Sequence, residues 1–327
     1  MNNSNKKTYI GIDVFKLICA VLIIYMHTYC FDGGVIGSWI KNILASVGVP
    51  FFFIVSGYFF AKGTENAVNP KAYVKKYLLR ILKIYVAWTI ITLPVSWYNI
   101  CIAHSDYSIL LKIIYLIRCF CLVGSLGVYW YIQSLFLSCA IWYFIWIKKA
   151  EKIFWPITIV LFIIGVMYRK GLLSETMLGT IIHVLFGSER NFLNVGLIYI
   201  GIGAWFYKKN IRIDLKIAVF TLALSFAIKT VIYRNAGFEF MEMFAAMSLF
   251  FVAIQMEVLP LKKYSVKLRQ LSTAMYLIHF PFILLFDYYL RKGTYIDFPI
   301  TLLFSLTVYF ISKRYFSEKW NLIIFGS

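Results

Sequence analysis

The sequence predicts an all-α integral membrane protein, a polytopic bundle of about ten transmembrane helices with both termini in the cytoplasm. Of its 327 residues, 61% are hydrophobic and only 14% are charged, whereas soluble domains carry about 25% charged residues. The mean hydropathy is +0.78, and apolar runs of about 20 residues, long enough to cross the hydrocarbon core, recur along the chain. This composition excludes a soluble protein, and we expect one membrane domain over residues 1–327.

Ten apolar runs are interpreted as membrane spans. The first follows two lysines and contains Asp13 and Lys16 without a small-residue cleavage site, so it predicts a retained helix rather than a signal peptide. The fifth and sixth runs are short. The ten spans are predicted at residues 10–31, 38–60, 81–102, 128–147, 153–168, 192–207, 215–233, 240–258, 270–290 and 296–313.

Two connections between these spans are long. Residues 103–127 contain an apolar run at 109–118 that holds two basic residues, which predicts either an interfacial amphipathic helix or part of an extra span. Residues 169–191 are rich in glycine and polar residues, and they predict an outer loop, re-entrant in one interpretation.

The basic residues give the orientation of the spans. Lysine and arginine number 33 against 14 acidic residues, a net charge of +19. Most of them fall in alternate connections, at residues 62–83, 148–152, 208–216, 262–269 and 313–319. Cytoplasmic loops are enriched in this way, so these segments and the N-terminus are predicted inside, and ten spans return the C-terminus there. The charge is thereby explained by topology and by contact with the lipid bilayer, without a nucleic-acid partner.

The first span carries three ionisable residues on one face, and such residues inside a membrane are functional candidates. At about 100° per residue, Asp13, Lys16 and His27 lie within one stripe. Lys16 and His27 are about 16 Å apart along the axis, so they do not form one catalytic pair. The residue that orients His27 must therefore come from another helix. The stripe is predicted to face the interior; in the alternative, Lys16 snorkels to the inner interface and His27 lies at the outer one.

Several short motifs follow one another along the whole chain. They are GlyIleAspValPheLys at 11–16 with His27 eleven residues after Lys16, ValProPhePhePheIleValSerGlyTyr at 49–58, Arg80-Ile-Leu-Lys83, TrpTyrIle at 130–132, ArgAsn at 190–191 and SerThrAlaMetTyrLeuIleHis at 272–279. In order and spacing this set resembles the bacterial acyltransferase-3 family, with Lys83 in place of the second arginine of an Arg-x-x-Arg motif. The last two motifs look closest to the subgroup that includes the membrane domain of vancomycin-resistance serine racemases. There the domain precedes a cytoplasmic racemase and is associated with serine uptake; we expect no racemase domain in this chain.

The resemblance implies a multi-pass O-acyltransferase of the bacterial cytoplasmic membrane. It implies transfer of an acetyl or other acyl group from cytoplasmic acetyl-CoA to a hydroxyl of a cell-surface glycan or small molecule. Such a transfer needs a base for the hydroxyl proton, and imidazole titrates near neutral pH, so His27 is the expected catalytic base. Lys16, Arg80 and Lys83 are the expected donor-binding residues for the phosphates. For Arg80 and Lys83, positive-inside anchoring is the alternative.

A second set of residues has expected supporting or acceptor-side roles: Asp13, Arg190, Asn191, Tyr276 and His279. A packing role with a bond to a backbone carbonyl is the alternative for His279, as is capping of the sixth span for Asn191. Glu242 and Asp287 are the acidic candidates for orienting His27.

Other function classes leave weaker traces. The six cysteines form no CxxC pair and the four histidines have no carboxylate at ligand spacing, so no metal site is expected. The alternative function is a permease for serine or a related small amino acid, against which stands the lack of a visible pair of interrupted helices. A membrane anchor or sensor for a cytoplasmic partner is a third hypothesis.

Overall fold

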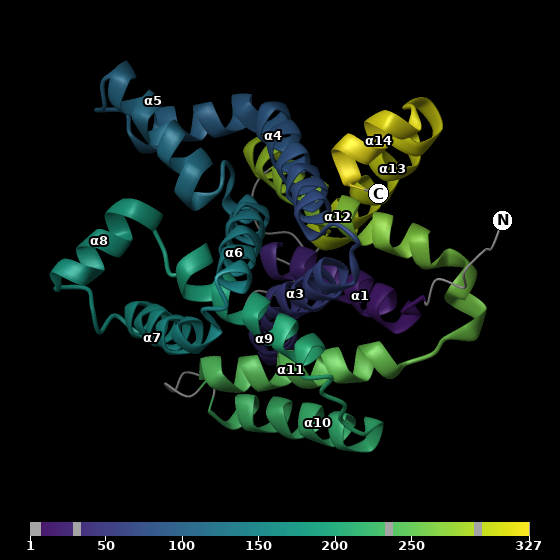
Figure 1. The fold of residues 1–327 in the computed structure, drawn as a ribbon. Helices are drawn as coiled ribbons and strands as arrows, with labels where there is room; N and C mark the ends of the chain where they lie inside the picture. Colours follow the sequence, from purple (N-terminus) through teal and green to yellow (C-terminus); the bar gives the residue numbers. More distant parts are fainter. Residues whose placement is uncertain (1–7, 29–33, 233–237, 291–295, 327) are drawn as a thin grey trace. The chain divides into compact units, whose positions relative to one another are not determined.

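The structure, a computed structural model, describes residues 8–28, 34–232, 238–290 and 296–326, without the side chains of 287–290. Within these residues every regular element is a helix, which confirms the all-α prediction. The chain forms two compact units (Figure 1). Unit 1 comprises residues 1–52 and 212–325, and unit 2 comprises residues 53–211. The boundary falls inside helix α3 (Gly48–Asn66).

Unit 1 is built around α1 and α12, which pack along each other. α1 also contacts α11, and α10 and α13 lie alongside α11 and α12, respectively (Figure 1). Besides the first residues of α3, the helices of this unit are α1 (Ile10–His27), α2 (Val35–Trp39), the π-helix η1 (Ile40–Leu44), the 3-10 helix η2 (Ala45–Val47), α10 (Leu215–Val231), α11 (Phe238–Gln255), the 3-10 helix η6 (Leu259–Tyr264), α12 (Ser265–Leu290), α13 (Asp297–Tyr315) and α14 (Glu318–Phe325).

Unit 2 is centred on α6, which packs against α4, α9 and the π-helix η5. α3 and α9 approach backbone to backbone, because a Cβ atom on Gly203 would lie 2.0 Å from the carbonyl oxygen of Ile54. The elements of this unit are the remainder of α3, α4 (Pro70–Ala103), α5 (Ile109–Arg118), the π-helix η3 (Cys119–Val123), the 3-10 helix η4 (Gly127–Tyr129), α6 (Trp130–Ile147), α7 (Glu151–Arg169), α8 (Met177–Phe186), η5 (Phe192–Gly196) and α9 (Leu197–Lys208).

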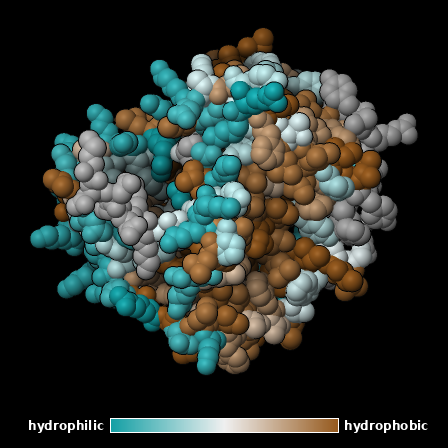
Figure 2. Space-filling model, turned by 90° about the vertical axis from the view of Figure 1, so that its right-hand side faces the viewer, coloured by the Kyte–Doolittle hydropathy of each residue, from teal (hydrophilic) through white to brown (hydrophobic). Residues whose placement is uncertain are grey.

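Each predicted span coincides with helix. Seven helical stretches are long and apolar enough to cross a membrane: Ile10–His27, Val35–Asn66, Pro70–Ala103, Gly127–Ile147, Glu151–Arg169, Phe238–Gln255 and Leu259–Phe286. The other three predicted spans fall on η5 with α9, on α10 and on α13. The predicted ends at residues 31 and 233 lie outside the described residues. Hydrophobic side chains lie exposed over a broad area of the face in Figure 2, as expected where helices meet lipid.

The structure differs from the predicted boundaries at α4 and α8. α4 begins at Pro70, well before residue 81, because Asn69 caps its N-terminus and the lysines that follow favour helix outside the hydrocarbon. α8 lies within the predicted outer loop, where the Thr176 side chain caps its first turn and Gly187 ends it with a φ of 72°. α5 covers the apolar run at residues 109–118 and continues directly into η3, and its place at the interface or in part of an extra span stays a prediction.

Candidate functional site

Polar residues of α1 meet α12 at two levels. Asp13 meets Ser265 at one level, and the ring of His27 meets that of His279 at the other; each pair is separated by 252 positions. The constant offset means that the two helices run parallel in one register. Over the 14 residues from Asp13 to His27, a rise of 1.5 Å per residue separates the two levels by about 21 Å. The stripe of α1 thus faces the interior at both ends, as predicted.

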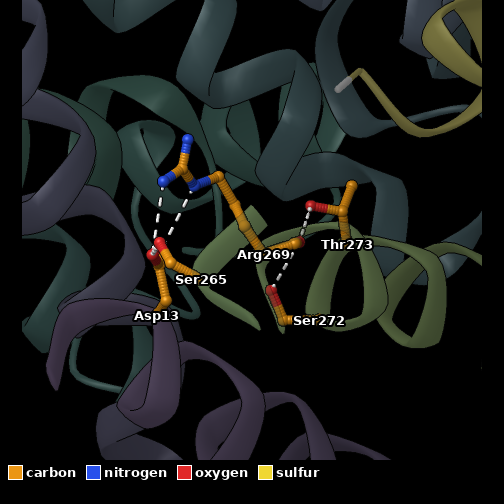
Figure 3. A network of polar contacts seen from close by, with 5 residues as sticks. All are labelled: Asp13, Ser265, Arg269, Ser272 and Thr273. Carbon is orange, nitrogen blue, oxygen red and sulfur yellow. Dashed lines mark hydrogen bonds and ion pairs between the residues drawn. The ribbon is translucent and has the colours of Figure 1, made fainter. Parts of the chain in front are cut away.

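At the first level, Asp13 forms an ion pair with Arg269 and a hydrogen bond with the hydroxyl of Ser265 (Figure 3). Asp13 as a whole residue is 3% exposed, and its carboxylate accepts a hydrogen bond from Ser265 Oγ. Arg269 donates to both carboxylate oxygens, from Nε at 3.1 Å and from Nη2 at 3.2 Å. A buried carboxylate is tolerated only when it is paired and hydrogen-bonded in this way. The Arg269 side chain itself remains 48% exposed.

The His27 level brings two histidines together. Their ring centroids are 5.5 Å apart, and the ring of Phe280 is 5.4 Å from that of His27. His279 is fully buried, and its Nδ1 lies 3.0 Å from the carbonyl oxygen of Met275. Because a carbonyl only accepts, Nδ1 is the donor, and Nε2 has no hydrogen-bond partner within the described part of the chain. The ring of Tyr276 is 5.9 Å from that of His279.

The predicted donor-binding residues belong to different units. Lys16 is half-buried, one turn along α1 from Asp13 in unit 1. Arg80 and Lys83 are exposed on α4 in unit 2, and Arg80 lies 5.3 Å from the ring of Tyr77. Neither forms an ion pair with another residue that the structure describes. A joint phosphate site for the three residues stays a prediction.

The predicted acceptor-side residues of the sixth span have structural contacts. Asn191 is buried, and its Oδ1 accepts from the backbone N–H groups of Leu193 and Asn194 at 2.9 and 3.0 Å, which caps η5. Arg190 is 3.7 Å from the Glu189 carboxylate, which also binds Arg169 at 3.0 Å. An acceptor contact for either residue stays a prediction.

Of the acidic candidates for orienting His27, Glu242 lies on α11, and the side chain of Asp287 lies outside the described residues. The ring partners that the structure gives His27 come from α12 instead. Which residue orients His27 stays a prediction.

The contacts of two basic residues were not predicted from the sequence. Arg269 stood only as one of the inner basic residues. Lys229, fully buried on α10, donates to the carbonyl oxygen of Ile43 at 2.9 Å and to Ser46 Oγ at 2.7 Å. These acceptors lie in η1 and η2, within the helical stretch of the second span. A lysine inside an apolar span was the available signal for this contact.

Comparison of the sequence with known proteins identifies a family. A family model described as an acyltransferase domain matches residues 9–313. Two proteins of Enterococcus faecalis named "Amino-acid racemase" are 34% and 28% identical over 54% and 38% of this chain, but over only 23% and 18% of their own lengths. A "Serine/alanine racemase" of Enterococcus gallinarum is 33% identical over 27% of this chain and 13% of its own. The matched segments thus span less than a quarter of these relatives, and no solved structure matches the chain. With nearly its whole length matched, the chain belongs to the acyltransferase-3 family and is an integral membrane protein.

Proposed function

We propose that this protein is a membrane O-acyltransferase that moves an acetyl group from acetyl-CoA to a hydroxyl of an acceptor, with His27 as the general base. The observation that carries the proposal is the α1–α12 pair. It holds two histidine rings 5.5 Å apart at one level and a charged cluster of Asp13 and Arg269 at the other.

His27 would accept the proton of the acceptor hydroxyl while the hydroxyl oxygen attacks the thioester carbonyl. When the tetrahedral intermediate collapses, the carbon–sulfur bond breaks and the thiol leaves with the proton that His27 returns. His279 supports this role because its Nδ1 is engaged with the Met275 carbonyl. Its buried Nε2 thus keeps a lone pair that can accept an N–H from His27 and fix the tautomer of that ring.

The spacing of the two levels suits a ligand with a charged end and a distant reactive end. Lys16 and His27 are separated by 11 residues of α1, about 16 Å along the helix axis. Acetyl-CoA carries its phosphates at the opposite end of an extended arm from the thioester. Its phosphates would lie at the level of Lys16, the predicted cytoplasmic end, and the thioester near His27.

Acetyl-CoA binding to the purified, detergent-solubilised protein tests the donor site. Lys16→Ala and Arg80→Ala are expected to weaken binding, whereas Lys112→Ala, a lysine of α5 on the predicted outer side, serves as the matched control. His27→Ala should still bind acetyl-CoA and lose acceptor acylation. Unchanged acylation in His27→Ala would refute the proposed base.

A serine permease is the second candidate. One feature favours it: a relative carries the name "Serine/alanine racemase". Flux of labelled serine into liposomes, without acetyl transfer in the same preparation, would select this function.

A further inference from the structure

Arg269 is held in place by buried partners while part of its guanidinium faces outward. Nε and Nη2 bind the Asp13 carboxylate, and Nη1 points away from it (Figure 3). Among the residues that the structure describes, Nη1 has no hydrogen-bond partner. The side chain is 48% exposed, while that of Asp13 is 4% exposed. The arrangement fixes the direction of the guanidinium and leaves a donor available to a ligand.

The surroundings of Arg269 are basic. Lys16 lies one turn along α1 from Asp13. On α13, Tyr309 donates to Gln270, the neighbour of Arg269, at 3.2 Å. Because Lys313 and Arg314 come about one turn later on α13, they lie at the same end of unit 1.

Carboxylates do not neutralise this end. The basic side chains without an ion pair to any described residue are Lys262, Lys263, Lys267, Lys313, Arg314 and Lys319. Glu257 and Glu318, the other acidic residues near these segments, form no ion pair in the described chain either. Asp13 binds two of the three nitrogen atoms of the Arg269 guanidinium. The basic residues without an ion pair give this end of unit 1 a positive charge, which attracts anions.

We propose that Arg269 binds a phosphate of the acyl-CoA donor, and that Asp13 and Ser265 are positioning residues that orient its guanidinium. This inference rests on the proposed acyltransferase function and adds a donor contact on α12. A guanidinium is suited to this role because its donors are planar, permanently charged and matched to phosphate oxygens. Fixing it against a buried carboxylate lowers the ordering cost of binding.

The test compares binding of acetyl-CoA with binding of acetyl-pantetheine, which has the thioester but no phosphate, to full-length protein in lipid-free detergent. Arg269→Gln is expected to raise the Kd for acetyl-CoA by about tenfold or more and to leave that for acetyl-pantetheine unchanged. Lys267→Gln, which removes the same charge from the same helix, is the matched control and should change either Kd less than twofold.

Arg269→Gln leaves the Asp13 carboxylate buried without its partner and is expected to destabilise the fold. The double variant Asp13→Asn/Arg269→Gln removes both charges while Ser265 still has a hydrogen-bonding side chain beside it. It should fold and show the same selective loss. Asp13→Asn alone keeps the cation but frees it, and it should weaken acetyl-CoA binding by a smaller factor.

The outcomes separate the site from the function. Equal losses in the Arg269 and Lys267 variants would mean diffuse attraction and overturn the proposal. So would loss of added phosphatidylglycerol binding with acetyl-CoA binding intact, since the phosphate would then be that of a lipid. If the wild type binds neither acetyl-CoA nor acetyl-pantetheine, the acyltransferase function itself fails, and this inference fails with it.

Discussion

His279→Phe is expected to slow acetyl transfer through its effect on His27. The ring centroids are 5.5 Å apart, and His279 Nε2, without a hydrogen-bond partner among the described residues, is the acceptor that we expect the N–H of a protonated His27 to reach during transfer. Phenylalanine keeps a ring of similar size against Tyr276 and removes both nitrogen atoms. A hydrogen bond to a group that becomes charged contributes about 1.5–3 kcal/mol, so kcat should fall about 10- to 150-fold. The KM for acetyl-CoA should not change, because the phosphates are expected about 16 Å or more away.

The assay follows release of the free CoA thiol in the presence of an acceptor with a free hydroxyl, with His27→Ala expected to lower kcat by about 10²- to 10⁴-fold. The double variant His27→Ala/His279→Phe should be no slower than His27→Ala alone, because a residue that acts through another adds nothing once its partner is gone. Phe280→Leu, which changes a ring 5.4 Å from His27 without touching a hydrogen bond, is the packing control. Multiplicative effects of the two histidine variants would refute the coupling.

Three substitutions test the packing that supports the site, each by the shift of the thermal unfolding midpoint in detergent. Gly203→Ala would place a Cβ atom 2.0 Å from a carbonyl oxygen of α3 and should cost about 1–3 kcal/mol. Gly48→Ala, whose Cβ would lie 3.3 Å from two side-chain carbons of Ile23 and 3.5 Å from the Cβ of Cys19, with no backbone atom among these nearest contacts, is its control and should change the midpoint less. Lys229→Met removes the ammonium that donates to the Ile43 carbonyl and to Ser46 Oγ, which leaves these two groups only their bond to each other, and should cost about 1–3 kcal/mol. An unchanged midpoint would contradict a stabilising role of Lys229. Asn191→Ala removes the cap of η5 and should cost about 1 kcal/mol. A fall in the rate of acylation with an unchanged unfolding midpoint would indicate an acceptor contact instead.

The helices were predictable from hydropathy where lipid sets their length. The first span was expected to start at residue 10 and α1 does so, and the sixth was expected at 192–207, where η5 and α9 run from Phe192 to Lys208. Hydropathy does not report helix that continues into water, so the early start of α4 was missed. Nor does it report backbone irregularity that depends on another element. The π-helix η1 is accompanied by a hydrogen bond from Lys229, more than 180 positions away.

The sequence predicted which residues of α1 share one face, but it did not predict the residues of α12 that they contact. Helical periodicity placed Asp13 and His27 on one face because that inference needs a single helix. Which helix faces them depends on tertiary packing, so the partners Arg269 and His279 stayed unconnected to α1. Ser265 and Arg269 are four residues apart on one face of α12, and the offset of 252 positions recurs at His279. One parallel register of α12 against α1 accounts for both contacts, but the sequence of neither helix predicts that register.

That shared register has a functional consequence. Because α1 and α12 supply both levels, a shift of one helix along the other by one turn, about 5.4 Å, would separate the histidine rings and the ion pair together. The buried Asp13–Ser265–Arg269 contacts therefore hold the alignment on which the His27–His279 contact about 21 Å away depends. A cation at the donor end that both aligns the helices and binds phosphate would link occupancy of the donor site to the geometry of the base. At one fixed concentration, acetyl-CoA should then raise the thermal unfolding midpoint of the wild type more than that of Asp13→Asn/Arg269→Gln, because the variant is expected to bind it less tightly.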